Sequence, residues 1–241
     1  MSAHVTQAMV LAAGLGTRME ALTKDRPKPL VEVAGRALID RVIDRLVQAG
    51  VTRMVINLHY KADQLQRHLQ QRRDVEILFS DERVHLLDTG GALAKALPHF
   101  KGRPFFVHNS DSIWIEQKVQ NLTTLMNRWD PTRMDSLLLL APRAEALGFD
   151  GPGDFFSDGQ DRLTRRAKAL HAPYVWTGVQ IASHALLEPC PGGAFSANIL
   201  LDRALKKRRL FGLPLKGTWM HVGSPEGVRA AQEMIRKESG G

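Results

Sequence analysis

Cysteine is nearly absent from this sequence, since Cys190 is the only one among 241 residues. A single cysteine cannot form an intrachain disulfide, which fits a reducing compartment. Long apolar runs are absent too, because no stretch approaches the roughly 20 residues that a helix needs to cross a bilayer. The first residues carry no basic flank before a short apolar run, so we expect no signal peptide. These absences predict a cytoplasmic protein without a membrane partner.

Acidic residues are fewer than basic ones, 25 against 33, which gives a formal net charge of +8. This charge favours anionic partners, but it does not choose between nucleic acid, membrane surfaces and small phosphates. The basic clusters lack interleaved aromatic residues and any nucleic-acid-binding motif, so we interpret them as solvated helix faces and loops and expect no nucleic acid partner. These clusters are Arg67–Arg73, Arg162–Lys168 and Lys206–Arg209.

Short apolar runs alternate with helical patterns along the first part of the chain. The runs predict buried strands at Ala8–Ala12, Met54–Leu58, Val75–Phe79, Pro104–His108 and Ser136–Leu140. Helices are predicted within Ala37–Gly50, Ala62–Arg72 and Gly90–Phe100. This alternation predicts an α/β fold with a mostly parallel sheet that helices cover on both faces.

After Ala141 the pattern becomes less regular. Gly148–Asp161 is rich in Gly and Asp and predicts a loop with a short strand, while Tyr174–Ser183 predicts a strand. A last helix is expected to begin with Ser224 as N-cap and Pro225 in its first turn. We see no repeat and no linker, and we therefore predict one domain over 1–241, with halves at 1–141 and 142–241.

A glycine turn follows the first predicted strand, in the sequence VLAAGLGTRM (10–19). Glycines let backbone N–H groups approach an anion closely, and Arg18 leaves the turn with a planar fork suited to phosphate oxygens. The P-loop motif and the dinucleotide-binding fingerprint are both absent. Lys28 follows between Pro27 and Pro29, which restrict the backbone around a compact positive charge. The two cations predict a phosphate clamp.

LAAGLGTRM followed by RPKPLVEVAGRALID resembles the signature of the sugar-1-phosphate nucleotidyltransferases. Among these, the chain is most similar to the uridylyltransferases that act on N-acetylmuramic acid 1-phosphate in peptidoglycan recycling. LDTGGALAKAL, HNSDSIW, GDF, WTGVQI and GTWMHVGSPE follow in the family's order. The resemblance covers nearly the whole chain. It implies a Rossmann-like fold of the nucleotide-diphospho-sugar transferase type, whose C-terminal part binds the sugar.

The resemblance implies that an NTP, UTP in the first place, reacts with a sugar 1-phosphate to give an NDP-sugar and pyrophosphate. A phosphate oxygen is already ionised at neutral pH, so alignment and charge neutralisation are the main catalytic tasks. Arg18, Lys28 and Asp111 are the catalytic candidates, and Lys28 is expected to contact ligands rather than core groups. The nucleotide-binding candidates are Ala13, Gly14, Gly16, Thr17, Arg18, Lys28, Thr89 and Gly90. We also expect Thr89 to cap a helix.

Two charged phosphates repel each other, so a divalent cation, Mg²⁺ or Mn²⁺, is expected between them. Asp111 lies just beyond a predicted strand and is the candidate ligand. His221 stands where the family usually carries a metal-binding Asp, which casts doubt on the second contact because Mg²⁺ prefers oxygen ligands. For the sugar, the resemblance implies Asp154, Thr177 and Gly178.

Three alternatives stay open. The enzyme could be a guanylyl-, thymidylyl- or cytidylyltransferase, because few hydrogen bonds decide the choice of base. His221 alone motivates a second reading, a nucleotide- or sugar-phosphate-binding regulator without activity. A nucleic-acid binder rests on the net charge alone. The oligomeric state cannot be read from the sequence, although a monomer is favoured.

Overall fold

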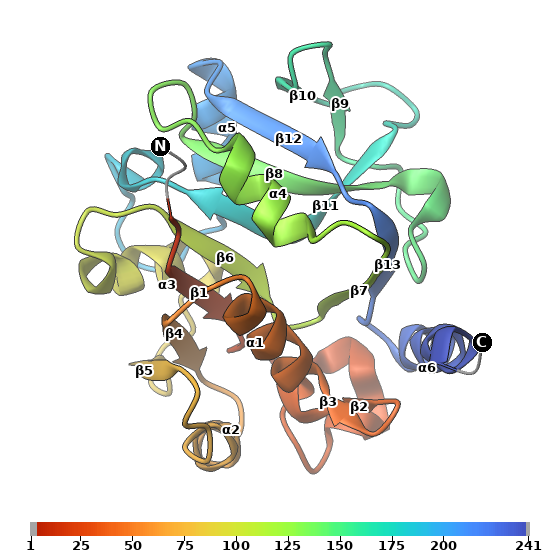
Figure 1. Ribbon diagram of the computed structural model, residues 1–241. Helices are drawn as coiled ribbons and strands as arrows, with labels where there is room; N and C mark the ends of the chain where they lie inside the picture. The colour runs from red at the N-terminus through yellow and green to blue at the C-terminus, as the bar shows by residue number, and fades with distance from the viewer. Residues whose placement is uncertain (1–3, 240–241) are drawn as a thin grey trace.

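A nine-stranded sheet forms the centre of the computed structural model, which describes residues 4–239 (Figure 1). Its strands are β1 (Gln7–Leu11), β4 (Arg53–Leu58), β5 (Glu76–Asp81), β6 (Phe105–Asn109), β8 (Ser136–Pro142), β9 (Phe155–Ser157), β10 (Leu163–Arg165), β11 (Tyr174–Ala182) and β12 (Leu210–Pro214). The strands β5, β4, β1 and β6 are adjacent and parallel. β11 runs antiparallel between β6 and β8, and β12 lies parallel to β8. The prediction of a mostly parallel sheet is confirmed, with β10 and β11 reversed.

The carboxyl ends of the parallel strands meet at one edge of the sheet. Leu11 pairs with Asn109, and Leu58 pairs with Asp81. The loops that follow β1, β4, β5 and β6 therefore start next to one another along this edge, which is where α/β folds bind their ligands.

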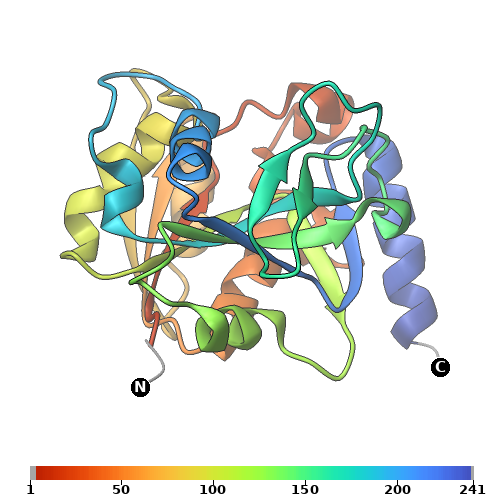
Figure 2. The same ribbon diagram turned by 90° about the horizontal axis from the view of Figure 1, so that it is seen from above.

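Helices cover both faces of the sheet (Figure 2). Successive residues of β1 point to opposite faces. Val10 belongs to the apolar cluster that includes residues of α1, α2 and α4, whereas Met9 belongs to the cluster that includes residues of α3 and α5. The helices are α1 (Leu38–Gln48), α2 (Ala62–Leu69), α3 (Asp88–Ala96), α4 (Asn121–Arg128), α5 (Asn198–Lys206) and α6 (Pro225–Ser239). Among residues 4–239, no helix is long and apolar enough to span a membrane.

Two short ribbons and several 3₁₀ turns complete the fold. β2 (Glu32–Val33) pairs with β3 (Arg36–Ala37), and β7 (Ser112–Glu116) pairs with β13 (Gly217–His221). The α6 helix contacts β2 and β13 at the side of the molecule (Figure 1). The 3₁₀ turns are η1 (Thr17–Thr23), η2 (Lys28–Leu30), η3 (Leu97–Phe100), η4 (Arg143–Glu145) and η5 (His184–Leu187).

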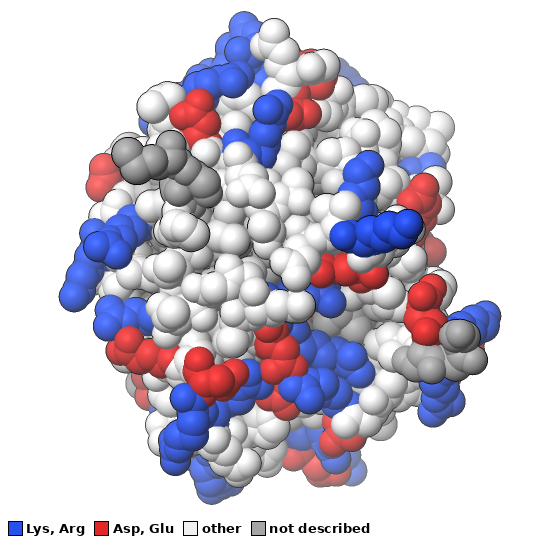
Figure 3. Space-filling model, in the orientation of Figure 1, with Lys and Arg blue, Asp and Glu red and all other residues white. Residues whose placement is uncertain are grey.

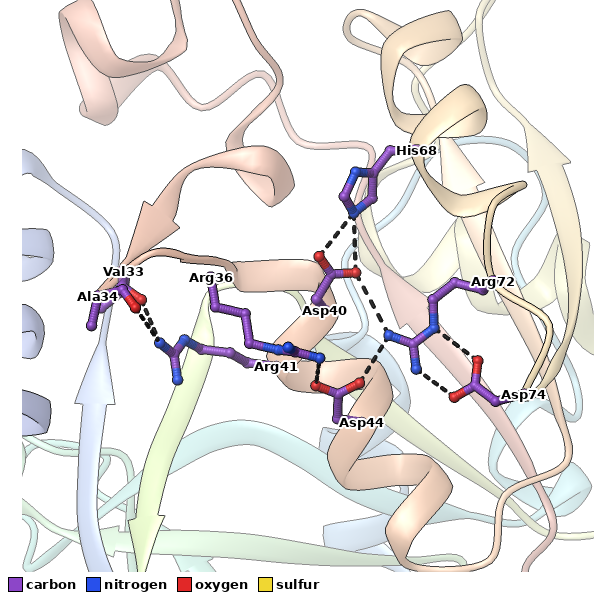
Figure 4. Close-up of polar contacts among 9 residues, drawn as sticks. All are labelled: Val33, Ala34, Arg36, Asp40, Arg41, Asp44, His68, Arg72 and Asp74. Carbon is purple, nitrogen blue, oxygen red and sulfur yellow. Dashed lines mark hydrogen bonds and ion pairs between the residues drawn. The ribbon is translucent and has the colours of Figure 1, made fainter. Parts of the chain in front are cut away.

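The polar side of α1 is tied to the chain around α2 (Figure 4). Arg72 donates to Asp44 and Asp74, at 2.8 and 2.6 Å. His68 contacts Asp40 at 2.9 Å. Because the opposite stripe of α1 is buried against the sheet, these ion pairs fix how the helix is seated and involve the basic cluster Arg67–Arg73.

The two predicted helix N-termini have different outcomes. Ser224 precedes α6, its hydroxyl accepts from the Gly227 N–H at 3.2 Å, and Pro225 opens the helix, so this prediction is confirmed. The prediction that Thr89 caps α3 is wrong. Leu87 is the N-cap without a side-chain hydrogen bond, and the Thr89 hydroxyl instead accepts from the Ala197 N–H at 2.9 Å.

Candidate active site

A cavity of about 420 Å³ opens at the carboxyl edge of the parallel strands. One wall is the glycine turn after β1, and the opposite wall is the loop that leads into α3. The residues that line the cavity are Leu11–Arg18, Lys28, Pro29, Asn57, Leu86, Asp88, Thr89, Asn109–Asp111 and Gly223. Ala13, Gly14, Gly16, Thr17, Arg18, Lys28 and Thr89 are thus brought together.

Gly90 is not brought into this group. A β-carbon at Gly90 would lie 2.4 Å from Cε2 of Phe195, so the close packing of α3 against that ring requires a glycine. The N–H groups of Gly90 and Gly91 both donate to the Phe195 carbonyl, at 2.8 and 3.1 Å. The glycine pair therefore serves the seating of α3, and only Thr89 of the two α3 candidates lines the cavity.

The glycine turn requires its second glycine for a physical reason. Gly16 has a left-handed backbone with φ of +67°, and its β-carbon would lie 3.0 Å from Thr23 Cγ2 and 3.1 Å from Lys28 Cβ. The turn can therefore pack directly against the segment that carries Lys28. Arg18 follows in η1, is exposed, and makes no ion pair among the described residues.

Lys28 and Asp111 form an ion pair inside the cavity. The Lys28 Nζ lies 2.6 Å from Asp111 Oδ2, and the two side chains are 12% and 19% exposed. Burial by itself would raise the pKa of Asp111, but the Lys28 ammonium and His221 hold this pKa below its ordinary value. Lys28 was expected to contact ligands rather than core groups, and the structure adds a partner within the protein, the Asp111 carboxylate.

A second cavity of about 460 Å³ adjoins the first. Both are lined by Arg18, Asn109, Asp111 and Gly223, so these residues form a shared wall. The other lining residues come from the later part of the chain: Gly148–Gly151, Asp154, Val175–Gly178, Trp219, His221 and Ser224. Asp154, Thr177, Gly178 and His221 are therefore close to one another, and the shared wall connects them with the nucleotide-binding candidates.

Two of the sugar-binding candidates are already engaged with backbone groups. Asp154 Oδ2 accepts from the Trp176 N–H at 2.9 Å, and its other oxygen accepts no hydrogen bond from the described residues. The Thr177 hydroxyl donates to the Leu139 carbonyl at 2.8 Å. The hydroxyl proton of Thr177 is thus used within the sheet, so Thr177 contributes to the shape of the cavity and offers no free donor to a ligand.

Asn109 belongs to the shared wall and was missed by the sequence analysis. Gly178 lies at an irregularity of β11, has φ of +79°, and its β-carbon would lie 2.4 Å from Asn109 Nδ2. The glycine therefore leaves space for this amide, whose Oδ1 is buried without a partner among the described residues. The position of Asn109 at the end of β6, two residues before Asp111, was the available signal.

β13 brings His221 to the metal candidate Asp111. Val222 N–H donates to the Asp111 carbonyl at 3.1 Å, and His221 pairs with Ser112 across the ribbon. Burial lowers the pKa of His221, as do Lys28 and Arg18, while Asp111 opposes them. The imidazole is therefore neutral at pH 7, in the form that can bind a metal.

An α/β sheet whose carboxyl edge carries two joined cavities, with Arg18 and Lys28 in their lining, is typical of proteins that bind phosphate-bearing ligands. A family model described as nucleotidyl transferase matches residues 7–149, and the chain belongs to this family.

Two relatives match over nearly their whole length. The chain is 45% identical over 232 residues to an N-acetylmuramate alpha-1-phosphate uridylyltransferase of Caulobacter vibrioides, covering 95% of this chain and 96% of the relative. A protein of the same name from Neisseria meningitidis is 31% identical, with 95% and 97% covered. Among solved structures, the inositol-1-phosphate CTP transferase from T. maritima matches with a TM-score of 0.79 at 18% identity, over 98% of both chains. This likeness confirms the fold.

Proposed function

We propose that the chain transfers the uridylyl group of UTP to N-acetylmuramic acid 1-phosphate, giving UDP-N-acetylmuramic acid and pyrophosphate in peptidoglycan recycling. The observation that carries the proposal is the pair of cavities that meet at Arg18, Asn109 and Asp111. This shared wall can hold the phosphate of a ligand in one cavity next to the phosphate of a ligand in the other. The choice of base and sugar rests on the two uridylyltransferase relatives.

Each half of the chain supplies most of one binding site in this proposal. UTP occupies the first cavity, which residues of 1–141 line apart from Gly223. The sugar phosphate occupies the second, to which the 142–241 half contributes Asp154, Thr177, Gly178 and His221. Asp154 accepts a hydrogen bond from a sugar hydroxyl through its remaining oxygen.

Catalysis is assigned to alignment and charge. A sugar phosphate oxygen attacks the α-phosphorus of UTP, the bond to the β-phosphate oxygen breaks, and pyrophosphate leaves. The nucleophile is already ionised, so no general base is needed. Lys28 neutralises the α-phosphate and the incoming phosphate, and Arg18 holds the departing pyrophosphate in its planar fork. Gly14, Gly16, Ala13 and Thr17 let the backbone approach the nucleotide.

The donors available for a divalent cation are few. Within residues 4–239, no group of three or more His, Cys, Asp or Glu side chains could hold a metal. Mg²⁺ commonly binds through one or two carboxylates together with substrate phosphates and water, and Asp111 beside the neutral His221 fits that mode. When bound, the cation neutralises phosphate charge. We therefore propose a site that the nucleotide completes, with Mg²⁺ or Mn²⁺ as its occupant.

The remaining proposals concern the partners, the cellular location and the oligomeric state of the enzyme. On the face drawn in Figure 3, basic and acidic groups are interspersed, which fits small anionic substrates better than nucleic acid. Arg165 of one basic cluster pairs with Asp202, and Arg209 of another pairs with Asp135. We propose a cytoplasmic monomer, because both substrates are small intracellular phosphates and the described cavities need no second chain.

A competition assay tests the proposal. The protein is incubated with Mg²⁺, equal amounts of the four NTPs and a panel of sugar 1-phosphates that includes N-acetylmuramic acid 1-phosphate. Pyrophosphate release and product mass are followed. UDP-N-acetylmuramic acid is the expected main product. A different NDP-sugar would contradict the assigned substrates, and binding without pyrophosphate release would support a regulator instead.

A further inference from the structure

Glu82 is a buried carboxylate that none of the proposed roles uses. It follows β5 directly and is 2% exposed. Within the described part of the chain, no Lys, Arg or His side chain forms an ion pair with it. A buried carboxylate without a cation is costly unless N–H donors satisfy it.

The donors of Glu82 come from two directions. Its Oε1 accepts from Asn57 Nδ2 at 2.9 Å, and its Oε2 accepts from the Leu87 N–H at 3.0 Å. The other end of the Asn57 amide, Oδ1, accepts from the Ala12 N–H at 2.7 Å. The chain of hydrogen bonds Ala12–Asn57–Glu82–Leu87 therefore crosses the carboxyl ends of β1, β4 and β5.

This relay connects the two walls of the first cavity. Ala12 begins the glycine turn that forms one wall, and Leu87 lies between Leu86 and Asp88 on the opposite wall. Asn57 lines the cavity between them. The buried side chains of Asn57 and Glu82 thus set the spacing of the two walls, although Glu82 does not line the cavity.

We propose that Glu82 is a positioning residue for the nucleotide: acting through Asn57 and Leu87, its carboxylate fixes the distance between the glycine turn and the start of α3. The inference rests on the proposed function only in naming UTP as the nucleotide. A carboxylate is required at position 82 because both neighbours present donors to it. Asn57 cannot turn its amide without placing its NH₂ group against the Ala12 N–H.

The test reverses the direction of the hydrogen bond between Asn57 and Glu82, by exchanging the amide and the carboxylate. Glu82→Gln sets an amide NH₂ against either Asn57 Nδ2 or the Leu87 N–H, and Asn57→Asp sets two carboxylates against each other. Each variant should weaken UTP binding about tenfold, because a buried polar group loses its partner. In the double variant an aspartate at 57 accepts from both Ala12 and the new amide, which in turn accepts from Leu87. Its UTP affinity should exceed that of either single variant.

Calorimetry with UTP measures these affinities without turnover, and steady-state kinetics adds a second readout. The KM for UTP should rise in each single variant, while in Glu82→Gln the KM for the sugar 1-phosphate and kcat at saturating UTP stay within about twofold of the parent. If the UTP affinity of the double variant fell by the product of the two single losses, the relay would be overturned. An unchanged UTP affinity of Glu82→Gln would overturn it as well.

Glu116→Gln is the matched control. Glu116 is likewise held by N–H donors: its Oε1 accepts from Trp114 Nε1 at 3.1 Å and from the backbone N–H and Nδ2 of Asn121 at 2.9 and 3.5 Å. Glu116 does not line the first cavity. This variant should lose stability and keep its UTP affinity. Equal weakening in Glu116→Gln would assign the effect to general destabilisation. A parent protein that binds no UTP would contradict the proposed function, whereas a parent that binds UTP while Glu82→Gln is unaffected would overturn the relay alone.

Discussion

The Lys28 ammonium contacts the Asp111 carboxylate in the free protein, and it contacts phosphate oxygens in the proposed complex. Lys28→Gln should lower kcat about a hundred- to a thousandfold, since one charge-assisted contact to the transition state is lost. The variant should also be less stable, because Asp111 keeps a half-buried charge without its cation. Rates with UTP and melting curves separate the two effects. Lys24→Gln removes an exposed charge nearby and serves as control, and a parent-like kcat in Lys28→Gln would remove the lysine from the mechanism.

If His221 is a ligand of the proposed cation, it should influence which cation suits the site. Imidazole binds Mn²⁺ more readily than Mg²⁺, so the parent should be more active with Mn²⁺ at equal concentration. His221→Asp should lower the Mg²⁺ concentration required for half-maximal activity and reduce the advantage of Mn²⁺. Metal titrations of initial rate measure both quantities. If the parent already saturates at low Mg²⁺ and the variant is unchanged, Asp111 and the nucleotide hold the cation without His221.

At the scale of elements, the turn into η1 couples the phosphate clamp to the stability of the fold. Gly16→Ala should cost about 1–2 kcal/mol, because the left-handed backbone penalises a side chain. Its β-carbon also meets Lys28 Cβ at 3.1 Å, so kcat should fall as the lysine is displaced. Gly14→Ala is the matched control for stability alone, because its β-carbon would meet nothing within 4 Å while Gly14 is itself assigned to the nucleotide. Urea unfolding and UTP kinetics test the pair, and equal unfolding free energies in both variants would contradict this account.

Much of the element order could be predicted from the sequence, because buried strands and amphipathic helices have distinct apolar periods. The helix predicted within Ala37–Gly50 is α1, which buries one apolar stripe, and Gly50, with φ of +92°, lies just beyond its end. The reversed direction of β11 could not be predicted, since an apolar run does not encode the direction of its neighbour. The helix α3 begins at Asp88, earlier than expected, and the N–H groups of Gly90 and Gly91 in its first turn donate to the carbonyl of Phe195, which is distant in sequence.

The candidate site shows the same division. Arg18, Lys28 and Asp111 were predicted from local motifs, and all three lie in one cavity. Asn109 and Glu82 were missed, because their importance depends on contacts between strands. Asn109 faces Gly178, and Glu82 contacts Asn57, pairs separated by 69 and 25 positions in the chain. A pattern within one segment contains no information about such partners.

For the whole molecule, acid stability depends on a buried histidine. Burial lowers the pKa of His108 from 6.5 to about 4. Between these values the unfolded chain binds a proton that the folded chain does not, so the free energy of unfolding should fall as the pH drops from 6.5 to 4. The full effect is about 3 kcal/mol at 1.36 kcal/mol per pH unit. Urea unfolding at pH 7 and pH 4.5 measures it.

His108→Asn removes the titrating group and retains a donor for the Asn109 carbonyl, which His108 Nδ1 contacts at 2.9 Å. This variant should lose less stability than the parent over the same pH interval. His99→Asn changes an exposed histidine and should behave as the parent does. An identical pH dependence in His108→Asn and the parent would assign the acid sensitivity to other groups.

Direct attack of a sugar phosphate oxygen on UTP is tested most directly by the configuration of the product at the α-phosphorus. The reaction is run with N-acetylmuramic acid 1-phosphate and a UTP whose α-phosphate carries one sulfur in a defined configuration. In the proposed mechanism the shared wall aligns two bound phosphates and Lys28 and Arg18 supply charge, so a single in-line displacement should give a UDP-sugar with inverted configuration. Retention would require two displacements through a nucleotidyl–protein intermediate, and it would contradict this mechanism.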